Sequence, residues 1–229
     1  MKTLGLIGGT SWVSTMDYYR LLNQLMNERL GGLTSAKLLL VSIDFQEFKS
    51  LLDKNNWDRI SEIFIEASRN LEKIGADSIV MCANTPHYVS DTVQKEISIP
   101  LLHIAEATAN EVLRREINKV LLLGTKFTME QEFFKKRLLI SKIETLIPDQ
   151  KDREFIHQNI FAELGKGIFK PETKRKYLDI IDKSVHEGAE GVIFGCTEIP
   201  MLIKQEDCRI PTFDSTLLHA RYAVDFALA

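Results

Sequence analysis

Short apolar runs alternate along the chain with longer amphipathic stretches. The apolar runs are Leu4–Ile7, Lys37–Ile43, Ser78–Cys82, Lys119–Leu123 and Gly191–Phe194. They are continuously hydrophobic, which is typical of parallel strands covered on both faces. The stretches that keep helical spacing, with charges opposite the apolar face, are Asp17–Leu30, Asp58–Ile74, Ile104–Glu116, Met129–Ser141 and Pro171–Glu187. This alternation predicts βαβ units and an α/β fold built on parallel sheets.

The second half of the sequence resembles the first half. Residues 73–81 match residues 186–194, with Gly75 and Gly188 lying 113 positions apart. The segments at 6–10 and 122–125, and the Ile-Pro pairs at 99–100 and 210–211, repeat in the same order at similar spacing. Shared order and spacing favour an internal duplication over chance likeness between βα units. We therefore expect two domains, formed by residues 1–100 plus 210–229 and by residues 101–209.

Composition and charge narrow the class of protein. The 229 residues are 45% hydrophobic and 27% charged, as in soluble globular domains. A net charge of -3 and a pI near 6.0 argue against nucleic-acid or anionic-membrane partners. No apolar run approaches the ~20 residues that cross a bilayer, and the glycine-broken start of the chain favours a buried strand over a signal peptide. Three cysteines favour free thiols and a cytoplasmic location.

Polar segments follow four of the expected strands. They are residues 8–11, 82–87, 124–128 and 195–200. Ligands of parallel α/β sheets bind at the carboxyl ends of the strands, where hydroxyl groups and helix N-termini suit a carboxylate or phosphate. Helix capping explains any one of these residues, but four segments in a repeated fold favour a small anionic ligand. Neither GxGxxG nor P-loop spacing is present, and Cys82 with His87 lacks a third metal ligand nearby.

Cys196 is the strongest single candidate for a catalytic residue. It follows a strand and precedes Thr197 and Glu198, where we expect the dipole of the next helix to lower the thiol pKa from about 8.5. A thiolate there could abstract a proton or attack carbon. Cys208 instead fits a buried structural cysteine.

Five motifs together resemble the aspartate/glutamate racemase family. They are Gly8–Trp12, Asn84–His87, Leu122–Thr125 with Thr128-Met129, Gly195–Ile199 and Asp214–Ala220, and they occur in family order over essentially the whole chain. The resemblance implies two pseudo-symmetric, flavodoxin- or Rossmann-like α/β domains with the active site between them. It also implies a homodimer, no pyridoxal phosphate or other cofactor, and racemisation by one cysteine from each half on opposite faces of the substrate's α-carbon.

The sequence departs from the family at the first catalytic cysteine. That cysteine directly precedes Asn-Thr in the family, and this position is Ala83 here. The internal repeat likewise pairs Cys196 with Ala83 rather than with Cys82. Neighbouring side chains of an extended segment point to opposite sides, so Cys82 is expected to face the sheet interior. A local bend could recruit Cys82 as the second catalytic thiol, or another group or water could serve. His87 is a conceivable base, but a histidine at a helix start is expected at the surface.

The resemblance also indicates residues that bind an acidic amino acid. A side-chain carboxylate needs a cation, and Lys49 and Lys166 lie near positions that are basic in aspartate-selective relatives. For either lysine alone a solvated surface charge is the simpler reading. The other expected substrate contacts are Thr10, Ser11, Ala83, Asn84, Thr85, Thr125, Thr128, Thr197 and Glu198. Glu198 could pair with the ammonium group or only favour the start of its helix.

Three functions fit the sequence. The first is cofactor-independent racemisation of an acidic amino acid, aspartate ahead of glutamate. The second is a single-cysteine lyase or isomerase of the same superfamily that acts on a dicarboxylate or an arylmalonate-like acid, which the alanine at position 83 suggests. The third is a degenerate homologue that binds an acidic ligand without chemistry.

Overall fold

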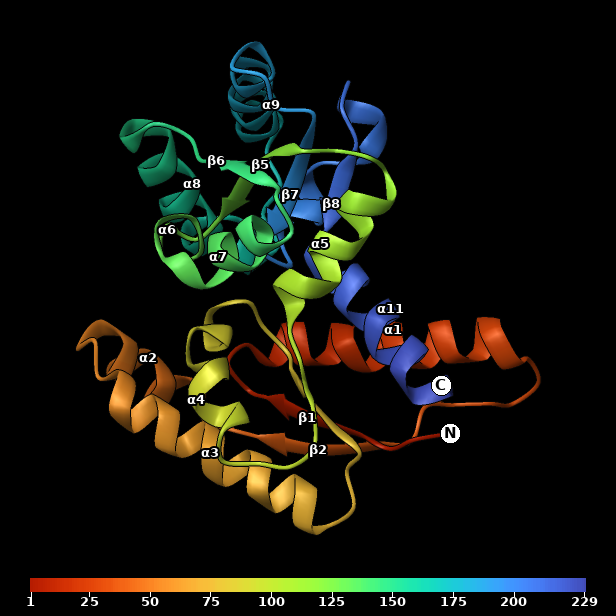
Figure 1. The fold of residues 1–229 in the computed structure, drawn as a ribbon. Helices are drawn as coiled ribbons and strands as arrows, with labels where there is room; N and C mark the ends of the chain where they lie inside the picture. The colour runs from red at the N-terminus through yellow and green to blue at the C-terminus, as the bar shows by residue number, and fades with distance from the viewer. The chain divides into compact units, whose positions relative to one another are not determined.

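The computed structural model describes all residues from 1 to 229, which form two compact units (Figure 1). Unit 1 consists of residues Met1–His103 and His219–Ala229, and unit 2 consists of residues Ile104–Leu218. The boundaries differ from the expected 1–100 plus 210–229 and 101–209. Residues 210–218 belong to unit 2 because the strand Thr212–Asp214 pairs with Gly191–Gly195.

Unit 1 is built on a four-stranded parallel sheet in the order β2-β1-β3-β4. The elements of unit 1 are, in chain order, β1 (Leu4–Gly8), α1 (Trp12–Leu30), β2 (Leu38–Ser42), α2 (Phe45–Asp53), α3 (Trp57–Lys73), β3 (Ser78–Met81), a 3-10 helix (Thr85–Val89), α4 (Ser90–Gln94) and β4 (Leu101–Leu102). The last helix, α11 (Ser215–Leu228), begins in unit 2 and continues into unit 1.

Helices cover both faces of the unit 1 sheet, as Figure 1 shows for α1 and α11 on one face and α3 on the other. Alternate strand residues divide between these layers. Leu6, Val80 and Cys82 pack with α1 and α11, whereas Ile7 and Met81 pack with α2 and α3. The continuous apolar runs are therefore explained by burial on two sides.

Unit 2 repeats this plan with a parallel sheet in the order β6-β5-β7-β8. Its elements are α5 (Ile104–Arg114), β5 (Lys119–Gly124), α6 (Lys126–Glu130), α7 (Glu132–Ile140), β6 (Glu144–Leu146), α8 (Gln150–Ala162), a 3-10 helix (Leu164–Lys166), α9 (Pro171–His186), β7 (Gly191–Gly195), α10 (Ile199–Leu202), a 3-10 helix (Gln205–Asp207) and β8 (Thr212–Asp214). The equal strand order supports the internal repeat, and the predicted α/β class with parallel sheets is confirmed.

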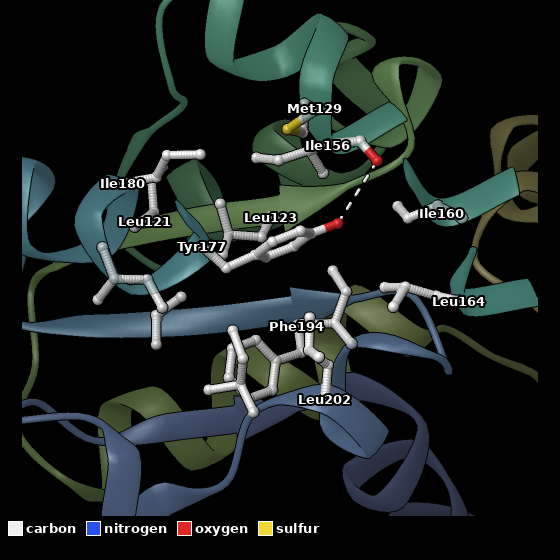
Figure 2. Close-up of a cluster of buried hydrophobic side chains, with 14 of the residues drawn as sticks. Leu121, Leu123, Met129, Ile156, Ile160, Leu164, Tyr177, Ile180, Phe194 and Leu202 are labelled. Carbon is white, nitrogen blue, oxygen red and sulfur yellow. Dashed lines mark hydrogen bonds between the residues drawn. The ribbon is translucent and has the colours of Figure 1, made fainter. Parts of the chain in front are cut away.

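The core of unit 2 also has two layers. Leu122 and Ile193 pack against α5 and α7, whereas Leu123 and Phe194 pack against α8 and α9. Tyr177 of α9 lies inside the second layer with its hydroxyl group donating to the carbonyl of Ile156 at 3.4 Å, the dashed line in Figure 2. This buried layer supports the turn that follows β7.

Close backbone approach requires glycine where β1 and β7 end. Gly9 has φ +90, and a Cβ there would lie 2.0 Å from the carbonyl oxygen of Ile43. In unit 2, a Cβ on Gly195 would lie 2.9 Å from the carbonyl oxygen of Leu123. Both turns can therefore stay tight only without a side chain at these positions.

None of the helices combines the length with the apolar character that a bilayer crossing requires.

Candidate functional site

The turn after β7 joins a thiol to a carboxylate. The Cys196 thiol donates to Oε2 of Glu198 at 2.8 Å, and the Thr197 hydroxyl donates to the same oxygen at 2.8 Å. All three residues are partly buried. One carboxylate oxygen thus accepts two hydrogen bonds, one of them from the thiol.

The surroundings of Cys196 disfavour its thiolate. Burial raises the pKa of the Cys196 thiol above its ordinary value, and the charge of Glu198 and its hydrogen bond raise it further. The backbone N–H groups of Glu198 and Thr197 oppose this effect only in part. The prediction of a lowered thiol pKa is therefore wrong. The helix that follows has only 4 residues, so its dipole is weak, and a carboxylate faces the sulfur.

Threonines at the end of the neighbouring strand complete this edge of unit 2. Gly124 and Gly195 are partners in the parallel pairing of β5 with β7, so Thr125 and Cys196 follow at the same level. The Thr125 hydroxyl caps α6 by accepting the N–H of Thr128 at 3.3 Å, and the two threonine hydroxyls lie 3.2 Å apart. Thr128 is fully buried, whereas Thr125 is partly exposed and available to a ligand.

Tyr177 connects the core to this turn electrostatically. Burial is the main cause that raises the pKa of Tyr177, and charges at Cys196, Glu163 and Glu198 raise it further. Tyr177 lies among the buried side chains drawn in Figure 2, so its hydroxyl group stays protonated.

The segment after α8 carries the exposed Lys166. Glu163 holds this segment, because its carboxylate accepts hydrogen bonds from Lys170 at 2.7 Å and from the Thr173 hydroxyl at 2.7 Å. Hydrogen bonding from Lys170 is the largest of the causes that lower the pKa of Glu163 to about 2. Lys166 makes no ion pair with the protein, which leaves its ammonium group available.

The turn after β1 in unit 1 is fixed by its own helix. The Ser11 hydroxyl caps α1 by accepting the N–H of Ser14 at 3.3 Å, and Thr15 accepts the N–H of Gly9 at 3.0 Å. Between them, the buried hydroxyl group of Thr10 has no hydrogen-bond partner in the protein. Because buried polar groups are normally paired, Thr10 is a candidate to bind a ligand.

The turn after β3 separates Cys82 from Ala83. Cys82 is 0% exposed, in the layer formed with α1 and α11, as expected from strand alternation. Burial raises the pKa of the Cys82 thiol far above its ordinary range, so we assign it no proton transfer. Ala83 and Thr85 are partly exposed, and Asn84 is 7% exposed. The expectation that His87 lies at the surface is wrong, because its side chain is 0% exposed.

Lys49 differs from Lys166 in having a partner. It lies on α2, and its ammonium group pairs with the Asp53 carboxylate one helical turn away at 2.5 Å. The pair is exposed to solvent, so a ligand that recruits Lys49 has only a weak ion pair to displace.

No group of three or more His, Cys, Asp or Glu side chains is arranged to hold a metal ion. The polar side chains that follow the strands are the thiol and carboxylate of the turn after β7, with hydroxyl and amide groups at the strand ends of both units.

The chain thus consists of two parallel α/β units with the same strand order, and a thiol follows strand β7. We compared this chain with known protein families and structures. The model of the Asp/Glu/Hydantoin racemase family matches residues 7–223, and the chain belongs to this family. Its relatives indicate an amino-acid racemase, which is an isomerase.

Individual relatives agree with this assignment. A candidate Asp/Glu racemase from Yersinia pestis is 44% identical, with 100% of both chains covered and a TM-score of 0.97. An aspartate racemase homologue from Pyrococcus horikoshii OT3 is 39% identical over 100% of both chains, with a TM-score of 0.90. The broad specificity amino-acid racemase RacX of Bacillus subtilis is 26% identical over 172 residues, covering 75% of this chain and 74% of RacX.

Proposed function

We propose that this protein racemises an acidic amino acid, aspartate ahead of glutamate, by proton transfer at the α-carbon without pyridoxal phosphate. The hydrogen bond from the Cys196 thiol to Glu198 is the observation that carries the proposal. It places a proton acceptor next to the sulfur, although burial and the charge of Glu198 both keep the resting side chain as a thiol.

The proton transfers form a closed cycle. Glu198 accepts the proton of Cys196, and the resulting thiolate takes the α-proton of the substrate, which leaves a carbanion and restores the thiol. A water molecule protonates the carbanion on the opposite face. The hydroxide ion left behind takes the proton held by Glu198, so both side chains return to their starting states.

Substrate binding is assigned to the polar groups at the strand ends. Thr125 and Thr197 offer partly exposed hydroxyl groups near Cys196, and Thr10 offers a buried hydroxyl that needs a partner. Ser11, Ala83, Asn84, Thr85 and Thr128 shape these turns. Lys166 is the cation proposed to select the side-chain carboxylate, because its ammonium group makes no ion pair; Lys49 is a second candidate.

Chiral chromatography tests this function. L-aspartate and L-glutamate are incubated separately with protein that has been treated with hydroxylamine and dialysed to remove any pyridoxal phosphate. We expect D-aspartate to form, with glutamate slower, and Lys166→Met to raise KM for aspartate more than kcat falls. Conversion of neither amino acid would refute the proposal.

Ala83 and the buried Cys82 favour one alternative, a single-thiol lyase or isomerase acting on a dicarboxylate such as maleate or a malonate. Turnover of such an acid, with none of an amino acid, would support it. A homologue that only binds its ligand would show thermal stabilisation by aspartate without turnover.

Two further features belong to the proposal. All three cysteines are free, which suits a reducing compartment such as the cytoplasm. The resemblance to the racemase family suggests a homodimer, and light scattering coupled to size-exclusion chromatography would measure its mass.

A further inference from the structure

Two buried side chains hold the consecutive carbonyl groups of the turn after β3. The hydroxyl group of Ser14 donates to the carbonyl oxygen of Cys82 at 2.7 Å. Nδ1 of His87 lies 2.9 Å from the carbonyl oxygen of Ala83. A carbonyl oxygen can only accept, so Nδ1 of His87 carries the hydrogen.

The ring of His87 is itself fixed in an unusual core. Its centroid lies 4.8 Å from that of His103 and 5.3 Å from that of His219, both in edge-on contact. All three rings are at least 97% buried. Polar rings are costly to bury, and a phenylalanine would fill the same space without that cost. The hydrogen-bonding capacity of the ring therefore explains a histidine at position 87 better than packing does.

His219 anchors this cluster in one orientation. Its Nε2 donates to the carbonyl oxygen of Leu102 at 2.7 Å, and its Nδ1 accepts the hydroxyl group of Tyr18 at 2.8 Å. Tyr18 comes from α1 and His219 from α11, so the helices on one face of the sheet hold the ring against which His87 rests. His87 cannot turn freely, and its Nδ1–H stays directed at Ala83.

We propose that His87 is a positioning residue, whose Nδ1–H fixes the Ala83 peptide and thereby sets Asn84 and Thr85 for the substrate. The inference rests on the proposed function, because it gives those two residues a role in binding. His87 touches neither the substrate nor the reacting atoms. Its effect passes through one peptide group: with the Ala83 carbonyl unpaired, the peptide can rotate and the side chains that follow it lose their orientation.

Two amide variants, which place an N–H₂ group at different positions of the ring, separate this role from simple core packing. In His87→Asn the side-chain N–H₂ replaces the Nδ1 donor, whereas in His87→Gln the amide lies at the position of Nε2. We expect H87N to keep kcat and KM for aspartate within about threefold of wild type. We expect H87Q to raise KM at least tenfold while kcat falls less. Equal loss in both variants, or no loss in H87Q, would overturn the proposal.

The tautomer of His87 gives a readout independent of turnover and of variant folding. Long-range proton–nitrogen NMR spectra of the wild-type protein should show His87 protonated at Nδ1. Protonation at Nε2 alone would overturn the inference, even if racemase activity is found. If wild type lacks activity but shows the Nδ1–H form, and the amide resonances of Ala83 and Asn84 shift in H87Q only, the proposed function fails while the positioning of the turn stands.

Discussion

The thiol of Cys196 donates a hydrogen bond to the carboxylate of Glu198, two residues further along the chain, across 2.8 Å. The same carboxylate has two opposite effects on the sulfur. Its charge raises the pKa of the thiol and disfavours the thiolate, yet its oxygen is the nearest acceptor for the thiol proton. Thiolate formation and proton exchange therefore respond differently when this carboxylate is removed.

Glu198→Gln separates the two effects. We expect the pH midpoint for alkylation of Cys196 to move to lower pH, because a negative charge beside the sulfur is lost. We expect the rate of α-proton exchange to fall by about 10²-fold or more, because the proton acceptor is lost. Peptide-resolved mass spectrometry after brief alkylation measures the first, and NMR in D₂O measures the second.

Glu206→Gln is the matched control, because Glu206 lies in unit 2 in the 3-10 helix Gln205–Asp207 and is exposed to solvent. The E206Q variant should have the same alkylation profile and the same rate of α-proton exchange as wild type. If E198Q exchanges the α-proton as fast as wild type, Glu198 is not the acceptor.

A thiol at position 83 should change the balance between exchange and inversion. Ala83 is the counterpart of Cys196 in the internal repeat and is partly exposed. Without a thiol on the opposite face, protonation there by water is slow and Cys196 mostly returns a proton to the face it left, so exchange should outpace inversion in wild type. Ala83→Cys should raise the ratio of inverted to exchanged product severalfold, as measured by chiral chromatography with mass detection. Ala83→Ser, of similar size but far less acidic, should not.

The buried histidine cluster should make unit 1 sensitive to mild acid. Burial, followed by the charge of His87, lowers the pKa of His219 to about 3. In the unfolded chain a histidine binds a proton below about pH 6.5, whereas the folded ring stays neutral. The contribution of His219 to the free energy of unfolding is therefore fully present above pH 6.5. It falls as the pH drops towards 3, by up to about 1.4 kcal/mol per pH unit.

Urea unfolding at pH 7 and pH 5 measures this effect before most carboxylates titrate. The two tryptophans, Trp12 and Trp57, both lie in unit 1, so their fluorescence reports its unfolding. We expect His219→Gln to be less stable than wild type at pH 7 but to lose about 2 kcal/mol less between the two pH values. Equal losses would show that His219 does not titrate on unfolding.

Continuous apolar runs predicted the five longer strands, because burial on both faces leaves a strong local signal. Three short strands, β4, β6 and β8, gave no such signal and form through pairing with their neighbours. The helix predicted over Met129–Ser141 is split, because Gln131 is extended (ψ 155) between α6 and α7. Helices α8 and α11 were not predicted.

The candidate site was predictable only as far as strand geometry determines it. The inward direction of Cys82 followed from alternation along β3 and is confirmed by its burial. The raised pKa of Cys196 depends on desolvation and on the orientation of Glu198, neither of which the sequence shows. The burial of His87 depends on His103 and His219, which are distant in the sequence.

Hydrogen exchange at the α-carbon tests the chemistry of Cys196 most directly. L-aspartate in D₂O is followed by proton NMR with wild type, Cys196→Ala and Cys208→Ala, the last removing another partly buried free thiol. The α-proton signal should disappear with wild type and with C208A, and persist with C196A. Undiminished exchange in C196A, or no exchange of any acidic amino acid by wild type, would contradict a proton transfer carried by Cys196.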